Sequence, residues 1–325
     1  MPVIKSSYRA PLYFFNGHLQ TIIPSLFREV PGVQYQRERL NTPDGDFLDL
    51  DWCRIKTATN KLVILSHGLE GDANRPYIKG MVQAMNQAGF HALAWNFRSC
   101  SGEPNKLLQS YHMGATDDLK LMIEYVLNQN QLQEIYLVGF SMGGNITLNY
   151  VGQQPEQLPQ QIKKAVVFSV PCHISSASRK MAQFENRVYM QRFLKSLRKK
   201  LTAKAALMPT TMTLDGYQRL RTFPEFDERY TAPIHGFKDA HDYYTKCSSK
   251  QYLPNIRIPT LLVNAQNDPF LSAECFPVKE AEANPYLFLE MPKDGGHVGF
   301  VKNYRQHKYY SEQRAVEFFT LQNLA

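Results

Sequence analysis

The chain has 325 residues, of which 43% are hydrophobic, and a formal net charge of +8. These values predict one globular domain with a sizeable insertion, and they exclude a chain that is largely disordered. No stretch approaches the roughly 18 apolar residues of a membrane-spanning helix, and the amino terminus lacks the pattern of a secretion signal. Because the five cysteines are an odd number without a C-x-x-C pair, a disulfide framework is not expected. We therefore expect a soluble cytoplasmic protein.

The positive charge is concentrated in one segment. Residues 173–204 contain nine lysines or arginines and a single acid, Glu185, whereas the rest of the chain has 28 basic and 28 acidic residues. A local surplus of this kind favours a segment with its own role over general nucleic-acid binding. Since no known nucleic-acid-binding module surrounds the segment, we expect no nucleic-acid partner.

The amino-terminal part of the chain predicts an arm, a hairpin and the first elements of a sheet. Residues 1–32 are aromatic and interrupted by prolines, which favours an arm over the surface without long elements. Residues 33–40 and 47–55 alternate in a strand-like way around the turn signal Thr42-Pro43-Asp44-Gly45, which predicts an antiparallel hairpin. Strands are then expected over 61–66 and 90–97, and helices over 76–88 and 116–129.

The second half continues the alternation of strands and helices around one long insertion. Residues 173 to about 244 contain no strand pattern and predict a helical insertion. The strands expected here are at 135–138, 164–170, 258–265 and 286–291. One helix is expected to begin at Met142, and two further helices are expected over 272–283 and 303–321. Strands that alternate with helices of about 10 to 15 residues indicate a mostly parallel sheet with helices on both faces. We expect a single α/β domain over 1–325.

The insertion has an amphipathic pattern. Apolar residues recur at three- to four-residue spacing with one wider gap, while Arg and Lys fill the other face. This stripe consists of Met181, Phe184, Val188, Leu194, Leu197 and Leu201. Because the insertion leaves the carboxyl edge of the sheet, we expect residues 173–204 to form the leading part of a cap over the site. Its basic face could contact an anionic membrane surface, or it could equally be the solvated side of an ordinary packed helix.

A G-x-S-x-G pentapeptide joins the central strand to the helix that follows it. Gly139-Phe140-Ser141-Met142-Gly143 lies between the apolar run 135–138 and the helix that begins at Met142. At such a turn the serine is held in an exposed, strained conformation at the carboxyl edge of the sheet. Two glycines around a serine also occur in ordinary turns, so the candidate nucleophile, Ser141, needs partners.

Two later residues are the candidate partners, because a serine hydroxyl needs a base and an acid that orients the base. Asp268 follows the strand expected at 258–265, and His297 lies in the glycine-rich loop before the last helix. The order Ser, Asp, His is typical of G-x-S-x-G on this type of sheet. Asp268 could instead cap the helix expected from Ser272, and Asp294 could orient His297 from a different strand.

Backbone amides complete the predicted site. Acyl transfer requires donors for the developing oxyanion, and we expect the N–H groups of Leu69 and Met142 in this role. Leu69 follows His67-Gly68, a glycine turn after the strand at 61–66. The side chain of His67 is expected to form a structural bond to this loop. No metal-ligand spacing such as H-E-x-x-H is present, so we expect no metal.

Five segments carry a resemblance to the YheT-like branch of the α/β-hydrolases. They are Gly17-His18-Leu19-Gln20-Thr21-Ile22-Ile23-Pro24, His67-Gly68-Leu69-Glu70-Gly71, the pentapeptide with Gly144-Asn145, 258–261 with Asp268-Pro269, and Gly295-Gly296-His297-Val298-Gly299-Phe300. The branch contains predicted bacterial and plant esterases that are related to animal membrane-anchored lipid hydrolases. Two positions depart from its pattern, because Ser99 stands where relatives have glycine and Asn267 where aspartate is common. We expect neither to touch the three predicted site residues, although Ser99 could alter the loop backbone near the pocket.

The resemblance implies an α/β-hydrolase fold and cofactor-free hydrolysis of short-chain or lipid-derived carboxylic esters. The predicted partner is a small ester substrate, with an acyl-enzyme on Ser141. Two alternatives remain open at this point. One is lipase, phospholipase or thioesterase activity at a membrane surface, and the other is a non-catalytic binding protein that keeps the fold.

Overall fold

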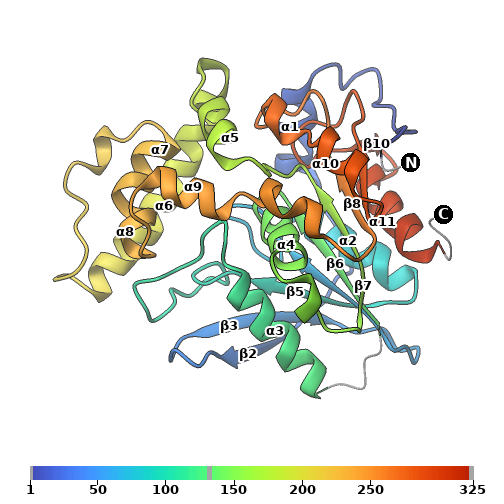
Figure 1. The fold of residues 1–325 in the computed structure, drawn as a ribbon, viewed down its shortest axis with the longest axis horizontal. Helices are drawn as coiled ribbons and strands as arrows, with labels where there is room; N and C mark the ends of the chain where they lie inside the picture. The colour runs from blue at the N-terminus through green and yellow to red at the C-terminus, as the bar shows by residue number, and fades with distance from the viewer. Residues whose placement is uncertain (1–2, 130–133, 322–325) are drawn as a thin grey trace.

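The computed structural model describes residues 3–129 and 134–321, and within them the main sheet has nine strands (Figure 1). Their spatial order is β1-β9-β8-β7-β6-β4-β5-β3-β2. All neighbouring pairs are parallel except β2 with β3 and β3 with β5. The strands are β1 (Val3–Ile4), β2 (Gln36–Asn41), β3 (Phe47–Cys53), β4 (Lys61–Ser66), β5 (His91–Asn96), β6 (Glu134–Phe140), β7 (Ile162–Phe168), β8 (Thr260–Val263) and β9 (Leu287–Glu290). The predicted fold class and its amino-terminal hairpin are confirmed.

Helices cover both faces of the sheet. On one face α3 and α4 share a core with the sheet, and on the other face α2 and α11 do so. The α-helices are α1 (Gly17–Phe27), α2 (Pro76–Gln87), α3 (Thr116–Gln129), α4 (Met142–Gln153), α5 (Ile174–Met181), α6 (Arg187–Leu207), α7 (Phe223–Phe226), α8 (Ala232–Ile234), α9 (Ala240–Cys247), α10 (Val278–Ala283) and α11 (Tyr310–Thr320). Among the described helices, none has the length and apolar character required to span a bilayer.

Side-chain alternation explains why the central strands read as continuous apolar runs. In β4, Leu62 and Ile64 enter one core cluster, while Val63 and Leu65 enter the cluster on the opposite face. Successive side chains of a strand point to opposite faces, and helices cover both faces here. Because neither face of the strand is exposed to solvent, polar residues do not alternate with apolar ones, and the strand is a continuous apolar run.

The arm contains more regular structure than the prolines suggested. The expectation of no long element in residues 1–32 is wrong, because α1 runs through Pro24 for 11 residues. Asn16 caps this helix by accepting a hydrogen bond from Leu19 N at 2.9 Å. A single proline removes only one backbone donor, and the cap and the packing of α1 against the domain are sufficient to keep the helix.

Two later helices are shorter than expected. The helix predicted over 272–283 is a short 3-10 turn at Ala273–Cys275, followed by α10 from Val278. Pro277 lies between them and has no backbone donor to continue the turn. The last helix begins at Tyr310 and not at residue 303, because a two-stranded hairpin comes first, formed by β10 (Val301–Asn303) and β11 (Lys308–Tyr309).

The insertion between β7 and β8 is helical in all its described elements from α5 to α9. Figure 1 shows α6, α7, α8 and α9 gathered at one side of the molecule, left in the view. The predicted apolar stripe is broken, because a 3-10 turn at Phe184–Asn186 separates α5 from α6. Met181, Leu194, Leu197 and Leu201 are buried as expected. Phe184 and Val188 are not, with 86% and 74% of their surface exposed.

Candidate active site

Ser141 lies at a sharp turn between the last residue of β6 and the first residue of α4. Its backbone has φ 53° and ψ −117°, a conformation that non-glycine residues rarely adopt. Strain of this kind persists only where the surrounding structure holds it, and it is concentrated at functional sites. The turn presents the Ser141 side chain at the carboxyl edge of the sheet.

The glycines of the pentapeptide are required by close approach. A Cβ atom on Gly139 would lie 2.6 Å from the carbonyl oxygen of Gly143, and one on Gly143 would overlap the backbone of Ser66. Larger residues would push the start of α4 away from β4 and β6. The tight packing of this turn therefore follows directly from the two glycines.

The structure brings the three predicted side chains together. His297 Nε2 lies 3.0 Å from Ser141 Oγ. On the other side of the ring, His297 Nδ1 lies 2.9 Å from Asp268 Oδ2 and 3.1 Å from Asp268 Oδ1. Asp268 is buried and lies just after β8, as the sequence predicted. A base in contact with both the nucleophile and an acid is the arrangement that serine acyl transfer needs.

Asp294, the alternative acid, has other partners. Its Oδ1 accepts hydrogen bonds from Gln20 Nε2 at 3.3 Å and from Asn267 Nδ2 at 3.1 Å. The alternative role of Asp268 was to cap a following helix. In the structure, Asp268 Oδ1 accepts a hydrogen bond from the nearby Phe270 amide at 2.9 Å, and the same carboxylate also faces His297. Asp268 therefore closes its own turn and reaches the histidine at the same time.

Helix α1 holds the histidine loop in place, a role that sequence reasoning missed. The amide of His297 donates to Thr21 Oγ1 at 2.8 Å, and the amide of Gly295 donates to Gln20 Oε1 at 2.5 Å. Both helical residues are buried. Residues 17–24 were among the segments that resemble the family, but they are so far from the histidine loop in sequence that no local pattern links the two.

The expected oxyanion donors lie beside the nucleophile. Gly68, which precedes Leu69, approaches so closely that a Cβ atom there would lie 3.3 Å from Ser141 Cβ. Met142 N–H is the first amide of α4, where the helix has no internal acceptor for it. Within the described part of the chain, neither the Leu69 nor the Met142 amide donates to another protein group. Both amides are thus free to receive an oxyanion.

His67 has the structural role that the sequence predicted. Its Nε2 accepts a hydrogen bond from the Phe97 amide at 3.1 Å, so Nδ1 carries the proton and donates to the Gly68 carbonyl at 2.8 Å. Burial lowers the pKa of His67 to about 3, which keeps the ring neutral. The ring thereby ties the end of β5 to the loop that carries Leu69.

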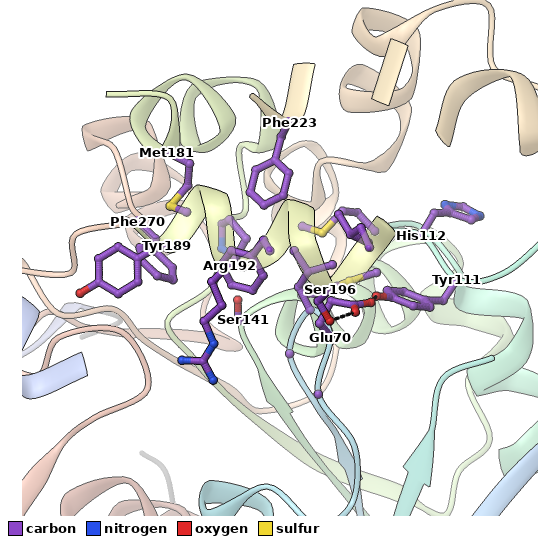
Figure 2. A pocket seen from close by; sticks show the side chains of 18 of the residues that line it. Glu70, Tyr111, His112, Ser141, Met181, Tyr189, Arg192, Ser196, Phe223 and Phe270 are labelled. Atoms are coloured by element: carbon purple, nitrogen blue, oxygen red, sulfur yellow. Dashed lines mark hydrogen bonds between the residues drawn. The ribbon is translucent and has the colours of Figure 1, made fainter. Parts of the chain in front are cut away.

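Glu70, directly after Leu69, joins this loop to the cap. Its carboxylate lies 2.8 Å from Lys200 Nζ and also accepts hydrogen bonds from Ser196 of α6 and from Tyr111 (Figure 2). Glu70 is buried and has a φ of 56°. Because the carboxylate takes a full set of donors at close range, it fixes α6 against the loop.

The pocket in front of Ser141 has a volume of about 340 Å³. Its lining comes mainly from α1, from the loops after β4 and β5 and from the cap, and it is largely apolar. Met181, Tyr189, Phe223 and Phe270 are among the side chains around it in Figure 2. The ring of Phe270 also packs on His297 with centroids 4.2 Å apart. A pocket of this kind is suited to an apolar part of a ligand.

The pocket is also lined by a partly buried acidic group on the cap side, Asp227. Asp227 accepts hydrogen bonds from Thr231 Oγ1 at 2.5 Å and from Tyr244 Oη at 2.6 Å. Burial raises its pKa to about 6, and burial lowers the pKa of nearby His112 to about 3 and of His235 to about 4. The two rings are in contact, with centroids 4.6 Å apart.

The two departures from the family pattern differ in their consequences. Ser99 lines the pocket and has a φ of 64°, the region that favours glycine, and its hydroxyl bonds to Asn105 Oδ1 at 2.5 Å. Asn267 contacts the histidine loop, which was not anticipated. Its Oδ1 accepts from the Gly296 amide at 3.0 Å, while its Nδ2 donates to Asp294. An aspartate could not donate in this second bond.

Comparisons with known proteins agree with the fold. A family model described as alpha/beta hydrolase fold matches residues 61–304. The esterase Pf2001 of Pyrococcus furiosus superposes with a TM-score of 0.56 at 17% identity, over 88% of this chain and 92% of that chain. The chain belongs to the α/β-hydrolase fold family.

Relatives of known name place the chain more narrowly. "Putative esterase YheT" of Escherichia coli is 34% identical over 94% of this chain and 91% of its own length. "Phospholipase ABHD3" of Homo sapiens is 27% identical over 93% of this chain and 75% of its length. "Monoacylglycerol lipase" of Saccharomyces cerevisiae is 26% identical over 91% and 77%. The predicted resemblance to the YheT-like branch is confirmed, and these relatives support an ester-hydrolysing activity.

Proposed function

We propose that this chain is a cofactor-free serine hydrolase that cleaves carboxylic esters through an acyl-enzyme on Ser141. The contact of His297 Nε2 with Ser141 Oγ, 3.0 Å, is the observation that carries the proposal. It is supported by the bond from His297 Nδ1 to Asp268, which fixes the tautomer that leaves Nε2 free to accept a proton.

The first half of the proposed reaction forms the acyl-enzyme. His297 Nε2 takes the proton from Ser141 Oγ as the oxygen attacks the ester carbonyl carbon. The negative charge that develops on the carbonyl oxygen is stabilised by the amides of Leu69 and Met142. The carbon–oxygen bond to the alcohol then breaks, and His297 gives its proton to the leaving alcohol.

The second half releases the acid. A water molecule takes the place of the alcohol, His297 accepts its proton, and the resulting hydroxide attacks the acyl carbonyl through the same oxyanion. When the bond to Ser141 breaks, the proton returns to Ser141 Oγ. Asp268 stabilises the imidazolium that forms in each half, and remains ionised throughout.

The pocket supports an ester whose acyl group is apolar. Its largely apolar lining is suited to a short or medium acyl chain, as in lipid-derived esters. Phospholipase-like and thioesterase reactions would use the same three residues. The other alternative, a binding protein without activity, would leave Ser141 unreactive.

Turnover of p-nitrophenyl esters of increasing chain length tests the proposal. We expect hydrolysis by the wild type and a loss of several orders of magnitude in kcat for Ser141→Ala. Circular dichroism and thermal unfolding of the variant serve as the control for folding. Turnover by Ser141→Ala at a rate close to that of the wild type would refute the proposal, as would the absence of any ester turnover by the folded wild type.

A further inference from the structure

The mouth of the pocket lies between α1 and α6. Most residues that line the pocket are buried or partly buried, but Ser25 of α1 and Arg192 of α6 line it and are also exposed. These two residues therefore mark where the pocket opens to the surface. The start of α6 is held beside α1, since His18 Nδ1 and Tyr189 Oη are 3.1 Å apart and their rings stack.

One edge of α6 at this mouth carries unpaired positive charge. Val188, Arg192, Lys195 and Lys199 lie within about 60° of one another around the helix axis, because they are three, four, seven and eleven residues apart. All four are exposed. In residues 3–129 and 134–321, the three cations of this edge form no ion pair and no hydrogen bond.

Arg192 differs in this respect from the other cations of the pocket. Lys200 is paired with Glu70, and Arg28 is paired with Glu312. Figure 2 shows Arg192 directed away from apolar side chains such as Phe223, on the opposite side of Ser141. An exposed arginine that lines a pocket and has no acidic partner among the described residues is suited to contact anionic groups outside the mouth.

Large apolar side chains are exposed on both sides of the same mouth. On α1, Leu26 follows Ile22 by one turn and is 54% exposed, whereas Ile22 lines the pocket. At the cap, Phe184 and Val188 are 86% and 74% exposed just before and at the start of α6. Their burial was expected from the sequence, and their exposure places apolar surface beside the cations.

We propose that this mouth face, formed by Leu26, Phe184 and the α6 edge Val188, Arg192, Lys195 and Lys199, docks on an anionic lipid bilayer. Apolar side chains would enter the interface while the cations contact lipid phosphates, the combination that peripheral membrane proteins use. The pocket would then open toward the membrane. Docking does not depend on catalysis, but delivery of a lipid ester to Ser141 rests on the proposed function.

Sedimentation of the full chain with vesicles tests the docking. We expect binding to vesicles of equal parts phosphatidylcholine and phosphatidylglycerol that decreases with added salt, and much weaker binding to phosphatidylcholine alone. Lys195→Glu/Lys199→Glu should bind the anionic vesicles at least about tenfold more weakly. Leu26→Asp/Val188→Asp should also weaken binding, but with a smaller change in salt dependence.

The matched control is Lys163→Glu/Arg257→Glu, which makes the same change in net charge. These residues are exposed and lie before or at the amino ends of β7 and β8, at the opposite edge of the sheet. The control should bind like the wild type. Equal losses in both charge-reversal variants, equal binding to neutral and anionic vesicles, or no binding would each overturn the proposal. Binding by Ser141→Ala should be normal, so a failure of hydrolysis would leave the docking result interpretable.

Discussion

Lys200, in the cap helix α6, lies 2.8 Å from Glu70, the residue that follows the expected oxyanion donor Leu69. The contact joins an insertion between β7 and β8 to the loop after β4. Because Glu70 is buried and two of its partners, Lys200 and Ser196, lie on α6, displacement of α6 would leave this carboxylate with the Tyr111 hydroxyl alone. The position of the cap and the geometry of the loop are therefore coupled.

Removal of one partner from this pair should destabilise the protein more than removal of both. Lys200→Met leaves the Glu70 carboxylate buried without its counter-ion, and we expect a loss of about 2 to 4 kcal/mol in the free energy of unfolding. The double variant Glu70→Gln/Lys200→Met should recover part of this loss. Urea unfolding of the two single variants and the double variant measures the coupling, and strictly additive losses would argue against it.

A single exchange at Asn267 should disturb the histidine loop. Asn267→Asp places a carboxylate next to Asp294 and removes the donor that Asn267 Nδ2 supplies. Repulsion between the two carboxylates should lower the free energy of unfolding by about 1 to 3 kcal/mol and reduce ester turnover. Asn267→Asp/Asp294→Asn exchanges the two groups and should restore most of both quantities. If the single variant matched the wild type, the described contact would have no energetic role.

Asp268 and Asp294 should respond differently to the same substitution. Asp268→Ala removes the partner of His297 Nδ1, so kcat should fall by about three to four orders of magnitude while the protein still folds. Asp294→Ala removes only acceptors for Gln20 and Asn267, and a much smaller decrease is expected. Parallel kinetics of the two variants provide the comparison. The reverse order of effects would assign the orienting role to Asp294.

The stability of the cap should depend on pH through Asp227. Burial raises the pKa of this carboxyl from its ordinary value of 3.8 to about 6. Between these values the folded chain keeps a proton that the unfolded chain has lost, so stability falls as the pH rises from about 4 to about 6. Asp227→Asn should remove this dependence and gain about 1 to 3 kcal/mol relative to the wild type between pH 4 and pH 7. Chemical denaturation of both proteins at these two pH values measures the difference, which would be absent if Asp227 titrated normally.

Local sequence patterns predicted the strands that are buried on both faces and the helices that bury one clear apolar stripe. Residues 61–66 and 116–129 form a strand and a helix with the predicted bounds, because apolar spacing and end signals agree there. The expectation failed where the effect of one proline was misjudged: α1 continues through Pro24, whereas the helix expected over 272–283 is interrupted at Pro277.

The candidate site was predictable where chain order and strand ends determine it, and not where it depends on distant contacts. Ser141, Asp268 and His297 lie together because the carboxyl ends of parallel strands share one edge. The hydrogen bond between Thr21 and His297 joins residues that are 276 positions apart. The hydrogen bond between Glu70 and Ser196 of α6 joins residues that are 126 positions apart. No local pattern reports such pairs. The exposure of Val188 likewise depended on the break between α5 and α6.

Labelling with a fluorophosphonate probe is the most direct test of the central claim that His297 activates Ser141 as a nucleophile. Such probes react with an activated serine and remain bound to it. We predict rapid labelling of the wild type, assignment of the modified peptide to Ser141 by mass spectrometry, and strongly reduced labelling of His297→Ala and Ser141→Ala. Absence of labelling in the folded wild type, or a label on another residue, would contradict the account.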